Sequence, residues 1–412
     1  MRFIRFFTVL RAIAVVIGIA VALLAIATYR TTATSSIGYP GVAMQVTESR
    51  EVLSEKWAEN QIPPALPPAS DRGANAAESY ENVQVLGHLS TAQFTRLMTA
   101  ITTWVSPNEG CAYCHNTENM ASDEVYQKVV SRRMIQMVWH VNENWQSHVQ
   151  ETGVTCYTCH RGQGVPQYAW ATQPEDATHG LGNRAYQNAP STLTGLSSLP
   201  QNAFETYLAP GAEANIRVQS GEPLPGGNRS SIKQTEWTYA LMMHFSGALG
   251  VNCTFCHNSR SWADWSQSPV QRTTAWYGIR MVRNVNQEYI ESLDDVFPEG
   301  AEGRRGPLGD LLKVNCATCH QGAYRPFLGE SMLGDYPTLA ASPEHAMTSA
   351  EVREQREAEE AAQAAAEAQA VEDSLAEEGA DAEAAEAAAD ADDPTEAGAA
   401  EEAADDDTEA VE

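Results

Sequence analysis

The pentapeptide Cys-x-x-Cys-His occurs four times in this sequence, as CAYCH at residues 111–115, CYTCH at 156–160, CTFCH at 253–257 and CATCH at 316–320. All eight cysteines of the chain fall in these motifs. The pattern is the attachment signature of haem c, in which both thiols bind the porphyrin and the histidine becomes the proximal iron ligand. The sequence therefore predicts four haem c groups and a protein that transfers electrons rather than an enzyme. The predicted attachment cysteines are Cys111, Cys114, Cys156, Cys159, Cys253, Cys256, Cys316 and Cys319, and the predicted proximal ligands are His115, His160, His257 and His320.

Two other uses of a Cys-x-x-Cys pair are a redox dithiol and half of a zinc site. Neither explains why a histidine follows every copy, or why no cysteine lies outside the four motifs. Haem attachment is the interpretation that uses all twelve of these side chains at once. Because the thiols end as thioethers, we expect no disulfides.

The N-terminus has the layout of a membrane anchor. Arg2, Arg5 and Arg11 precede an apolar run at residues 12–29, which is long enough to cross a bilayer as one helix. Basic residues on the leading side place the N-terminus in the cytoplasm and the remainder outside, where bacteria attach haem c. The alternative is a signal peptide cleaved after residues 25–27, Ala-Ile-Ala. We favour a retained single-pass anchor, because the apolar run exceeds a usual signal core of about 7–15 residues.

Negative charge is concentrated at the C-terminus. From Ala350 onward there are 24 acidic residues against Arg353 and Arg356, a net charge of −22, so only −6 of the total −28 belongs to the rest of the chain. This sign disfavours nucleic-acid binding. The tail has almost no large apolar residues and cannot bury a core, so we expect it to be disordered. A solvated extension is the simpler interpretation, and steering of a basic donor protein is the alternative.

The predicted fold class is mainly α with long irregular loops. The proline-rich stretch at residues 62–68 is expected to be extended rather than helical. The Gly/Pro/Asn/Ser-rich stretch after the second motif is expected to be mostly loop. We divide the chain into residues 1–30, an anchor or signal segment; 31–81, an extended segment; 82–170, a unit for haems 1 and 2; 171–230, connecting loops; 231–330, a unit for haems 3 and 4; and 331–412, the C-terminal segment with the tail.

The haem region contains an internal duplication. Residues 94–98 resemble residues 237–242 before the first and third motifs, and residues 137–145 resemble residues 281–289 before the second and fourth. The first and third motifs both continue into Cys-His-Asn, whereas the second and fourth both read Thr-Cys-His-x-Gly. Each half is therefore expected to contain two helices, each followed by a haem motif. Two haem-pair units related by a pseudo-twofold axis follow from this repeat.

A His-bound haem iron that only transfers electrons needs a second axial ligand, and methionine gives a higher potential than histidine. Met98 precedes Cys111 by 13 residues, and Met242 precedes Cys253 by 11. These positions coincide in the repeat, so we predict that Met98 and Met242 are the distal ligands of haems 1 and 3. Met243 is the rival for the third haem, and core packing is the alternative role for a helical methionine.

For the second and fourth haems the residues alone leave two readings open. Met137 aligns with Met281, which makes these two the ligands of haems 2 and 4. Alternatively, Met134 binds haem 2, and because Met134 aligns with Gly278 the fourth haem must take its ligand from elsewhere. His148, which lies 14 residues after Met134, is the candidate in that case.

These four motifs, their pairing and the duplication resemble the tetrahaem cytochrome subunit of purple-bacterial photosynthetic reaction centres, over about residues 40–330. The resemblance implies three His/Met haems and one His/His haem, the fourth. Carried over by position, it makes Met98, Met134 and Met242 the three methionine ligands and His148 the distal ligand of the fourth haem, and it assigns Met137 to packing. The chain lacks the lipidated N-terminal cysteine of several members, and the apolar helix would replace it as anchor.

The resemblance also implies the partners. The subunit would sit on the periplasmic side of the inner photosynthetic membrane, bound to the L and M subunits with their bacteriochlorophyll special pair. A soluble cytochrome c or high-potential iron–sulfur protein would reduce a roughly linear row of haems. The third haem would lie nearest the special pair and the first farthest from it.

Two other functions are alternatives to that of a reaction-centre cytochrome subunit. A membrane-anchored multihaem cytochrome of anaerobic respiration would use histidine on both sides of most haems, which leaves Met98 and Met242 without a role. A multihaem enzyme such as a nitrite reductase needs an open iron site, usually with a departed motif, and none of the four motifs departs.

Overall fold

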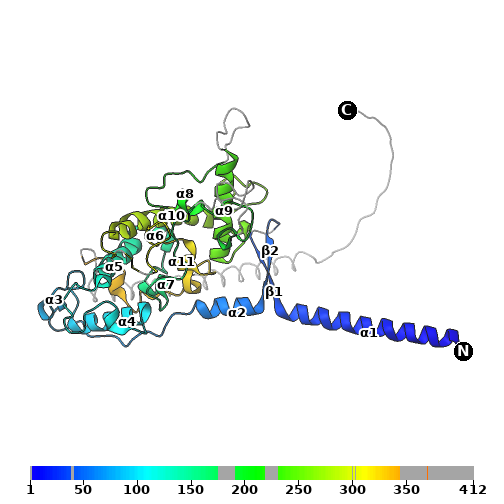
Figure 1. The fold of residues 1–412 in the computed structure, drawn as a ribbon, viewed down its shortest axis with the longest axis horizontal. Coiled ribbons are helices and arrows are strands. Elements are labelled where there is room, and N and C mark those ends of the chain that lie inside the picture. The colour runs from blue at the N-terminus through cyan, green and yellow to red at the C-terminus, as the bar shows by residue number, and fades with distance from the viewer. Residues whose placement is uncertain are drawn as a thin grey trace, which may run out of the picture. The chain divides into compact units, whose positions relative to one another are not determined.

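The computed structural model describes residues 2–38, 41–174, 191–218, 231–298, 300–301, 303–343 and 369. The chain forms two compact units, Met1–Ala346 and Met347–Glu412. The acidic tail belongs to the second unit, so the expectation that it is disordered lies outside the described residues. The first unit is mostly helical, as predicted (Figure 1). Its longer elements are α1 (Arg2–Thr31), β1 (Thr32–Ile37), β2 (Met44–Ser49), α2 (Arg50–Glu59), α4 (Thr91–Val105), α5 (Tyr126–Asn144), α9 (Ile232–Leu249) and α10 (Gln271–Asn284).

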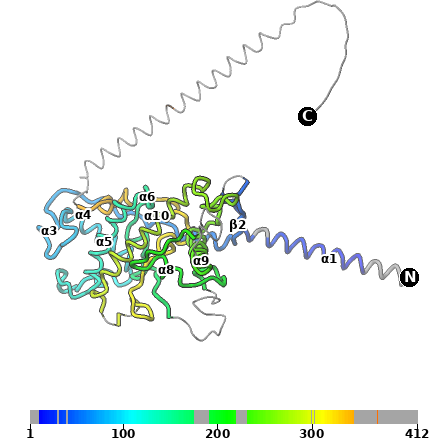
Figure 2. The backbone as a smooth tube through the Cα atoms, turned by 90° about the horizontal axis from the view of Figure 1, so that it is seen from above, coloured from blue at the N-terminus to red at the C-terminus, as the bar shows by residue number. Residues whose placement is uncertain are grey.

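Short helices and turns complete the first unit. They include α3 (Ala76–Ser79), α6 (Gln146–Val149), α7 (Cys156–His160), α8 (Ala203–Tyr207), α11 (Cys316–His320) and the 3-10 turns η1 (Gly110–Tyr113) and η4 (Cys253–Phe255). Helix α10 runs on into a π-helical turn, η5 (Val285–Ile290). In both views α6 lies beside α10, so the segment before the second motif reaches the helix of the other half (Figures 1 and 2).

Helix α1 is the predicted N-terminal helix. Its segment Leu10–Thr28 has a mean hydropathy of 2.7, and none of it is buried by the rest of the chain. A helix of this length and composition is suited to crossing a bilayer. It is the one helix among the described residues that passes this test.

An antiparallel hairpin and a helix follow α1, where the sequence analysis expected only an extended segment. Strands β1 and β2 pair in register from Thr32 opposite Ser49 to Ile37 opposite Met44. The hairpin escaped prediction because its strands are short and largely polar, without the alternation of a half-buried strand. Residues 62–68 lie outside every helix and strand, which agrees with the expectation that they are not helical. Tyr336 holds this stretch by accepting a hydrogen bond at its hydroxyl from the Leu66 N–H, 3.1 Å.

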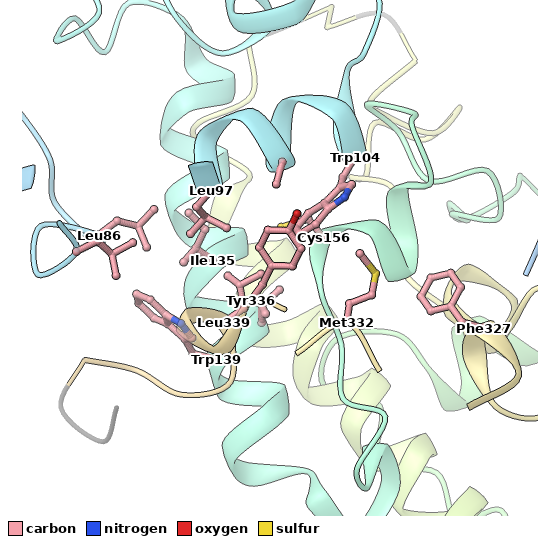
Figure 3. Packing of buried hydrophobic residues seen from close by; sticks show 13 residues of the cluster. Leu86, Leu97, Trp104, Ile135, Trp139, Cys156, Phe327, Met332, Tyr336 and Leu339 are labelled. Atoms are coloured by element: carbon pink, nitrogen blue, oxygen red, sulfur yellow. The ribbon is translucent and has the colours of Figure 1, made fainter. Parts of the chain in front are cut away.

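The core of the first half forms between α4 and α5. Helix α4 begins at a capping box of Ser90 and Gln93 and buries Leu97 and Trp104 on one face. Ile135 and Trp139 of α5 face them (Figure 3). The segment after the fourth motif closes this core, because Tyr336 packs edge-on against Trp104 at 4.7 Å between ring centres. A second core lies between α8, α9 and α10, around Phe204, Tyr207, Leu241, Ile279 and Val282.

Candidate haem-binding sites

The four motifs adopt two backbone forms, and the forms alternate along the chain. The first and third motifs begin as the 3-10 turns η1 and η4. The second and fourth are the short helices α7 and α11. The two short helices begin alike, because the N–H of Thr155 and the N–H of Asn315 each bond a threonine hydroxyl three residues later at 2.9 Å. The local structure therefore pairs motif 1 with motif 3 and motif 2 with motif 4, as the duplication predicts.

The imidazole of each motif histidine is held through its Nδ1 atom. In the first and third motifs the acceptor is the carbonyl five residues later, Met120 for His115 at 3.3 Å and Trp262 for His257 at 3.1 Å. A carbonyl can only accept, so Nδ1 carries the proton in both rings. The lone pair is then on Nε2, the tautomer that a proximal iron ligand needs.

In the second and fourth motifs the acceptor lies three residues later. His160 donates to the carbonyl of Gln163 at 2.8 Å, and His320 donates to that of Ala323 at 3.0 Å. Burial lowers the pKa of both rings, that of His320 to about 4. A neutral ring at physiological pH keeps its Nε2 lone pair free for a metal. In all four predicted proximal histidines, Nδ1 thus donates to a backbone carbonyl and Nε2 is left free for a metal.

A large cleft lies above the second motif. The space between its walls, part of which is open to solvent, is about 1190 Å³. His160, Cys156 and Cys159 lie on one side, and Met134 lines the cleft from α5. Met137 also reaches the cleft but packs in an apolar cluster with Val141, Met281 and Val285. The walls of one cleft thus bring together two cysteines, a histidine and a methionine.

Another cleft, of about 1200 Å³ including space open to solvent, lies above the fourth motif. We call it the fourth cleft, and the one above the second motif the second cleft. Cys316, Cys319, His320 and His148 all line it. The ring centres of His148 and His320 are 6.0 Å apart. A metal–imidazole bond is about 2 Å long, so two bonds in line plus the distances from nitrogen to ring centre span roughly 6 Å. The two rings are therefore spaced as the two axial ligands of one iron would be.

Gly278 is the reason that His148 can stand there. A Cβ atom at Gly278 would lie 2.5 Å from Cε1 of His148, closer than carbon atoms pack. The His148 Nδ1–H donates to the carbonyl of Thr274 at 2.9 Å, on the same helix, so Nε2 is free. The ring thus fills the space beside the position that aligns with Met134. The ring of His148 can occupy this position only because residue 278 has no side chain.

The remaining predicted methionines lie on the helices before the first and third motifs. Met98 on α4 is half-buried against the first core, and Met242 on α9 is half-buried against the second. The rival Met243 faces Gly195, since a Cβ there would lie 3.2 Å from the Met243 methyl carbon. Of the outer motifs' cysteines, Cys111 is exposed and Cys114 is half-buried, with its sulfur 3.5 Å from the Ser131 hydroxyl. Cys253 and Cys256 are half-buried.

Equivalent residues of the two halves touch each other. The sulfur atoms of Cys159 and Cys319 are 3.0 Å apart, and Nε2 of His140 lies 2.7 Å from Oδ1 of Asn284. These pairs occupy matching positions in the repeat. Contacts between identical positions are what a twofold arrangement produces.

Two buried asparagines repeat the same bonds in each half. Asn142 bonds both the N–H and the carbonyl of Val154, at 2.8 and 2.9 Å. Asn286 does the same with Val314, at 2.9 and 3.0 Å. Each valine lies two residues before a motif, so each asparagine ties its helix to the start of α7 or α11. These residues were missed in the sequence analysis, although residues 137–145 and 281–289 already aligned them.

Comparison with known proteins identifies the class. Residues 29–340 match the family described as "Photosynthetic reaction centre cytochrome C subunit". The chain is 51% identical over 316 residues to a photosynthetic reaction center cytochrome c subunit of Rubrivivax gelatinosus, covering 76% of this chain and 85% of the relative. It is 49% identical over 306 residues to that of Thermochromatium tepidum (74% of each chain) and 40% identical over 350 residues to that of Roseobacter denitrificans (79% and 92%). These matches do not favour a cytochrome of anaerobic respiration.

Proposed function

Since this chain belongs to the family of photosynthetic reaction centre cytochrome c subunits, we propose that it binds four haem c groups and passes electrons from a soluble periplasmic donor to the photo-oxidised bacteriochlorophyll pair. It is an electron-transfer subunit of the photosynthetic reaction centre. The bound haems supply the one-electron iron chemistry, and the chain sets their potentials through axial ligands, burial and nearby charge.

The observation that carries the proposal is the fourth cleft, where the ring centres of His148 and His320 are 6.0 Å apart. We propose that they are the two axial ligands of the fourth haem. Cys316 and Cys319 in the same cleft would attach it. Two imidazoles give a lower potential than an imidazole with a thioether, so the fourth haem would be the low-potential member.

The other three haems would be His/Met. Met134 and His160 share the second cleft, which supports the pair Met134/His160 for haem 2. The matching places of Met98 on α4 and Met242 on α9 support Met98/His115 for haem 1 and Met242/His257 for haem 3. The attachment pairs for these haems would be Cys156 and Cys159, Cys111 and Cys114, and Cys253 and Cys256.

The haems would be arranged as two pairs, in residues 82–170 and 231–330, related by a pseudo-twofold axis. The contacts of Cys159 with Cys319 and of His140 with Asn284 support this axis. Because the two sulfurs are 3.0 Å apart, porphyrins bonded to them would nearly touch. The second and fourth haems would then be neighbours in the middle of a row, with the first and third at its ends.

The hairpin after α1 supports the orientation of this row. Thr254, inside the third motif, donates its hydroxyl hydrogen bond to the carbonyl of Ile37, and Asn252 donates to the carbonyl of Met44 at 3.0 Å. If α1 spans the inner membrane, the chain leaves the bilayer near Thr31, and a six-residue strand reaches about 20 Å. The third haem would therefore lie at the membrane end, next to the L and M subunits. The first haem would face the periplasm and its donor, a cytochrome c or a high-potential iron–sulfur protein.

The test is purification of the tagged full-length chain from its native membranes. Bacteriochlorophyll should co-purify, and the haem content should be four per chain. A variant with both Cys253 and Cys256 replaced by alanine should contain three haems and serves as the control for the count. A haem protein that purifies without pigment would contradict the proposal.

A further inference from the structure

The walls of the two clefts share one feature that haem ligation does not explain. The second cleft is lined almost entirely by uncharged side chains, and among the described residues of its wall Arg304 is the only arginine, lysine or carboxylate. The fourth cleft repeats this, with Arg325 as the only such residue of its described wall. A guanidinium beside an apolar cavity is costly unless an acceptor compensates its charge. Each cleft therefore has one positively charged side chain in its described wall.

Arg304 is held in place by two neutral acceptors. It donates to the carbonyl of Gly164 at 2.8 Å and to the hydroxyl of Tyr113, and its side chain is half-buried. Neither acceptor neutralises the charge, yet both fix the direction of the guanidinium.

The acceptors place Arg304 at the joint between the first two motifs. Tyr113 stands between the cysteines of the first motif, and Gly164 follows the second. A Cβ atom at Gly164 would lie 2.2 Å from the Tyr113 hydroxyl oxygen, so the ring of Tyr113 packs directly on this backbone. Arg304 belongs to the loop before the fourth motif and connects these two segments by its hydrogen bonds to both. Three segments that are distant in the sequence thus meet at the guanidinium of Arg304.

A haem is an apolar disc whose two propionate carboxylates lie on one edge. An arginine is the side chain best suited to bind a carboxylate, because its guanidinium donates two parallel hydrogen bonds and stays charged. We propose that Arg304 binds a propionate of the second haem and raises its potential. Arg325 has the same role at the rim of the fourth cleft, where its exposure to water weakens the effect. The inference rests on the proposed attachment of the second haem in this cleft.

The sign follows from electrostatics. A fixed positive charge near the iron stabilises the reduced state, which carries one positive charge less, and it cancels part of a propionate's negative charge. Removing it should shift the midpoint potential of the second haem downward. A purely structural role, in which Arg304 only ties two loops, predicts no such shift once the protein is assembled.

The experiment is a spectroelectrochemical titration of the haem-loaded complex, resolved by haem, for R304Q, R304K, R325Q and R305Q. Arg305 is the matched control, because it is in the same loop but forms an ion pair with Asp294 at 2.5 Å and does not line the cleft. R304Q should change the ratio of oxidised to reduced second haem about tenfold at a given potential, a fall of about 59 mV. R304K should shift it less, R325Q should shift the fourth haem by a smaller amount, and R305Q should shift neither.

Two results would overturn the proposal. One is an R304Q protein that contains four haems and whose second haem has a midpoint potential shifted no further than in R305Q. The other is an R304K protein in which this potential falls as far as in R304Q. If R304Q does not assemble, redox-induced infrared difference spectra of the unmutated protein and R304K decide the question. The propionate carboxylate bands should differ between the two, and identical bands contradict the proposal. Haem content and the far-red methionine–iron band report whether the second haem is attached and ligated as proposed. A failure of that proposed ligation can therefore be distinguished from a failure of the proposed role of Arg304.

Discussion

At the scale of single residues, Gly278 and His148 occupy one space. Gly278 lies in the middle of α10, where an alanine would ordinarily favour the helix. The ring of His148 lies so close that no Cβ fits without displacing it. The glycine is therefore a requirement of the fourth site rather than of the helix.

Replacing Gly278 with alanine tests this directly. G278A should push His148 out of line with His320 and remove the low-spin bis-histidine signal of the fourth haem in electron paramagnetic resonance. We expect a loss of stability of about 1–3 kcal/mol from overpacking. G247A is the matched control, because a Cβ at Gly247 in α9 meets nothing within 4 Å and should stabilise the helix by about 0.4–1 kcal/mol. An unchanged fourth haem in G278A would refute the role of His148.

A second residue-scale prediction separates Met134 from Met137. M134L should remove the contribution of the second haem to the far-red methionine–iron band of the oxidised protein. M137L should leave the band intact and cost less than about 1.5 kcal/mol, because leucine and methionine exchange readily in a core. Loss of the band in M137L alone would reverse the assignment.

The motif residues, Met98 and Met242 could be proposed from motif, repeat and spacing, which are local features of the sequence. The choice of Met134 and His148 came from the family resemblance. Thr274 and Arg304 could not be predicted, because each joins its site from a segment far away in the chain. Thr274 reaches His148 across 126 positions, and Arg304 reaches Tyr113 across 191. No periodicity or spacing signals such a meeting. Only the packing of the loops brings these groups together.

At the scale of elements, the duplicated unit is a helix whose asparagine holds the start of the next motif. Asn142 and Asn286 are buried, and each makes three hydrogen bonds to backbone groups. A third bond from each reaches a segment outside its repeat, the carbonyl of Leu339 or of Leu208. The same side chain thus fixes a helix, a motif and a covering segment.

Replacing either asparagine should therefore have similar consequences. N142A and N286A should each lower the free energy of unfolding by about 2–4 kcal/mol, because buried backbone groups lose their partners. The exposed Asn144 is the control, and N144A should stay within about 0.5 kcal/mol of the unmutated protein. Denaturant titration followed by haem absorbance measures all three. A tenfold difference in unfolding constant between N142A and N286A would speak against equivalent halves.

The elements that the sequence predicted well are those with strong local signals. Helices α4 and α9 begin at the capping residues Ser90 and Ser231. Helices α5 and α10 begin at Val125 and Val270 without a side-chain cap, but each buries one apolar face. The hairpin and α2 lack an apolar face, because their side chains are mostly exposed and polar, although α2 is capped by Ser49. The hairpin contacts the third motif, and Asn60 at the end of α2 donates to the carbonyl of Gln321 after the fourth motif. The local sequence does not contain these contacts.

At the scale of the whole molecule, the described chain links a membrane-length helix to a haem motif through one hairpin. Gly38 makes the contact possible, since its φ is +124° and a Cβ there would lie 2.6 Å from the Thr254 hydroxyl oxygen. If α1 is a retained anchor, the hairpin would also set the height of the third motif above the membrane. An anchor that is cleaved after export could not do this.

We therefore predict that α1 is retained in the mature protein. The intact mass of the purified subunit should include the segment Leu10–Thr28, and the protein should stay in the membrane after a carbonate wash. An N-terminus beginning just after Ala27 would show that the segment is a cleaved signal.

The most direct test of the account is flash spectroscopy on the native membranes. After a single flash, the α-band of a high-potential haem should bleach as the bacteriochlorophyll pair is re-reduced, with matching time courses. Loss of this chain should slow that re-reduction and remove the haem signal. Re-reduction of the pair at an unchanged rate without any haem oxidation would contradict the assignment of this chain as the electron donor of the reaction centre.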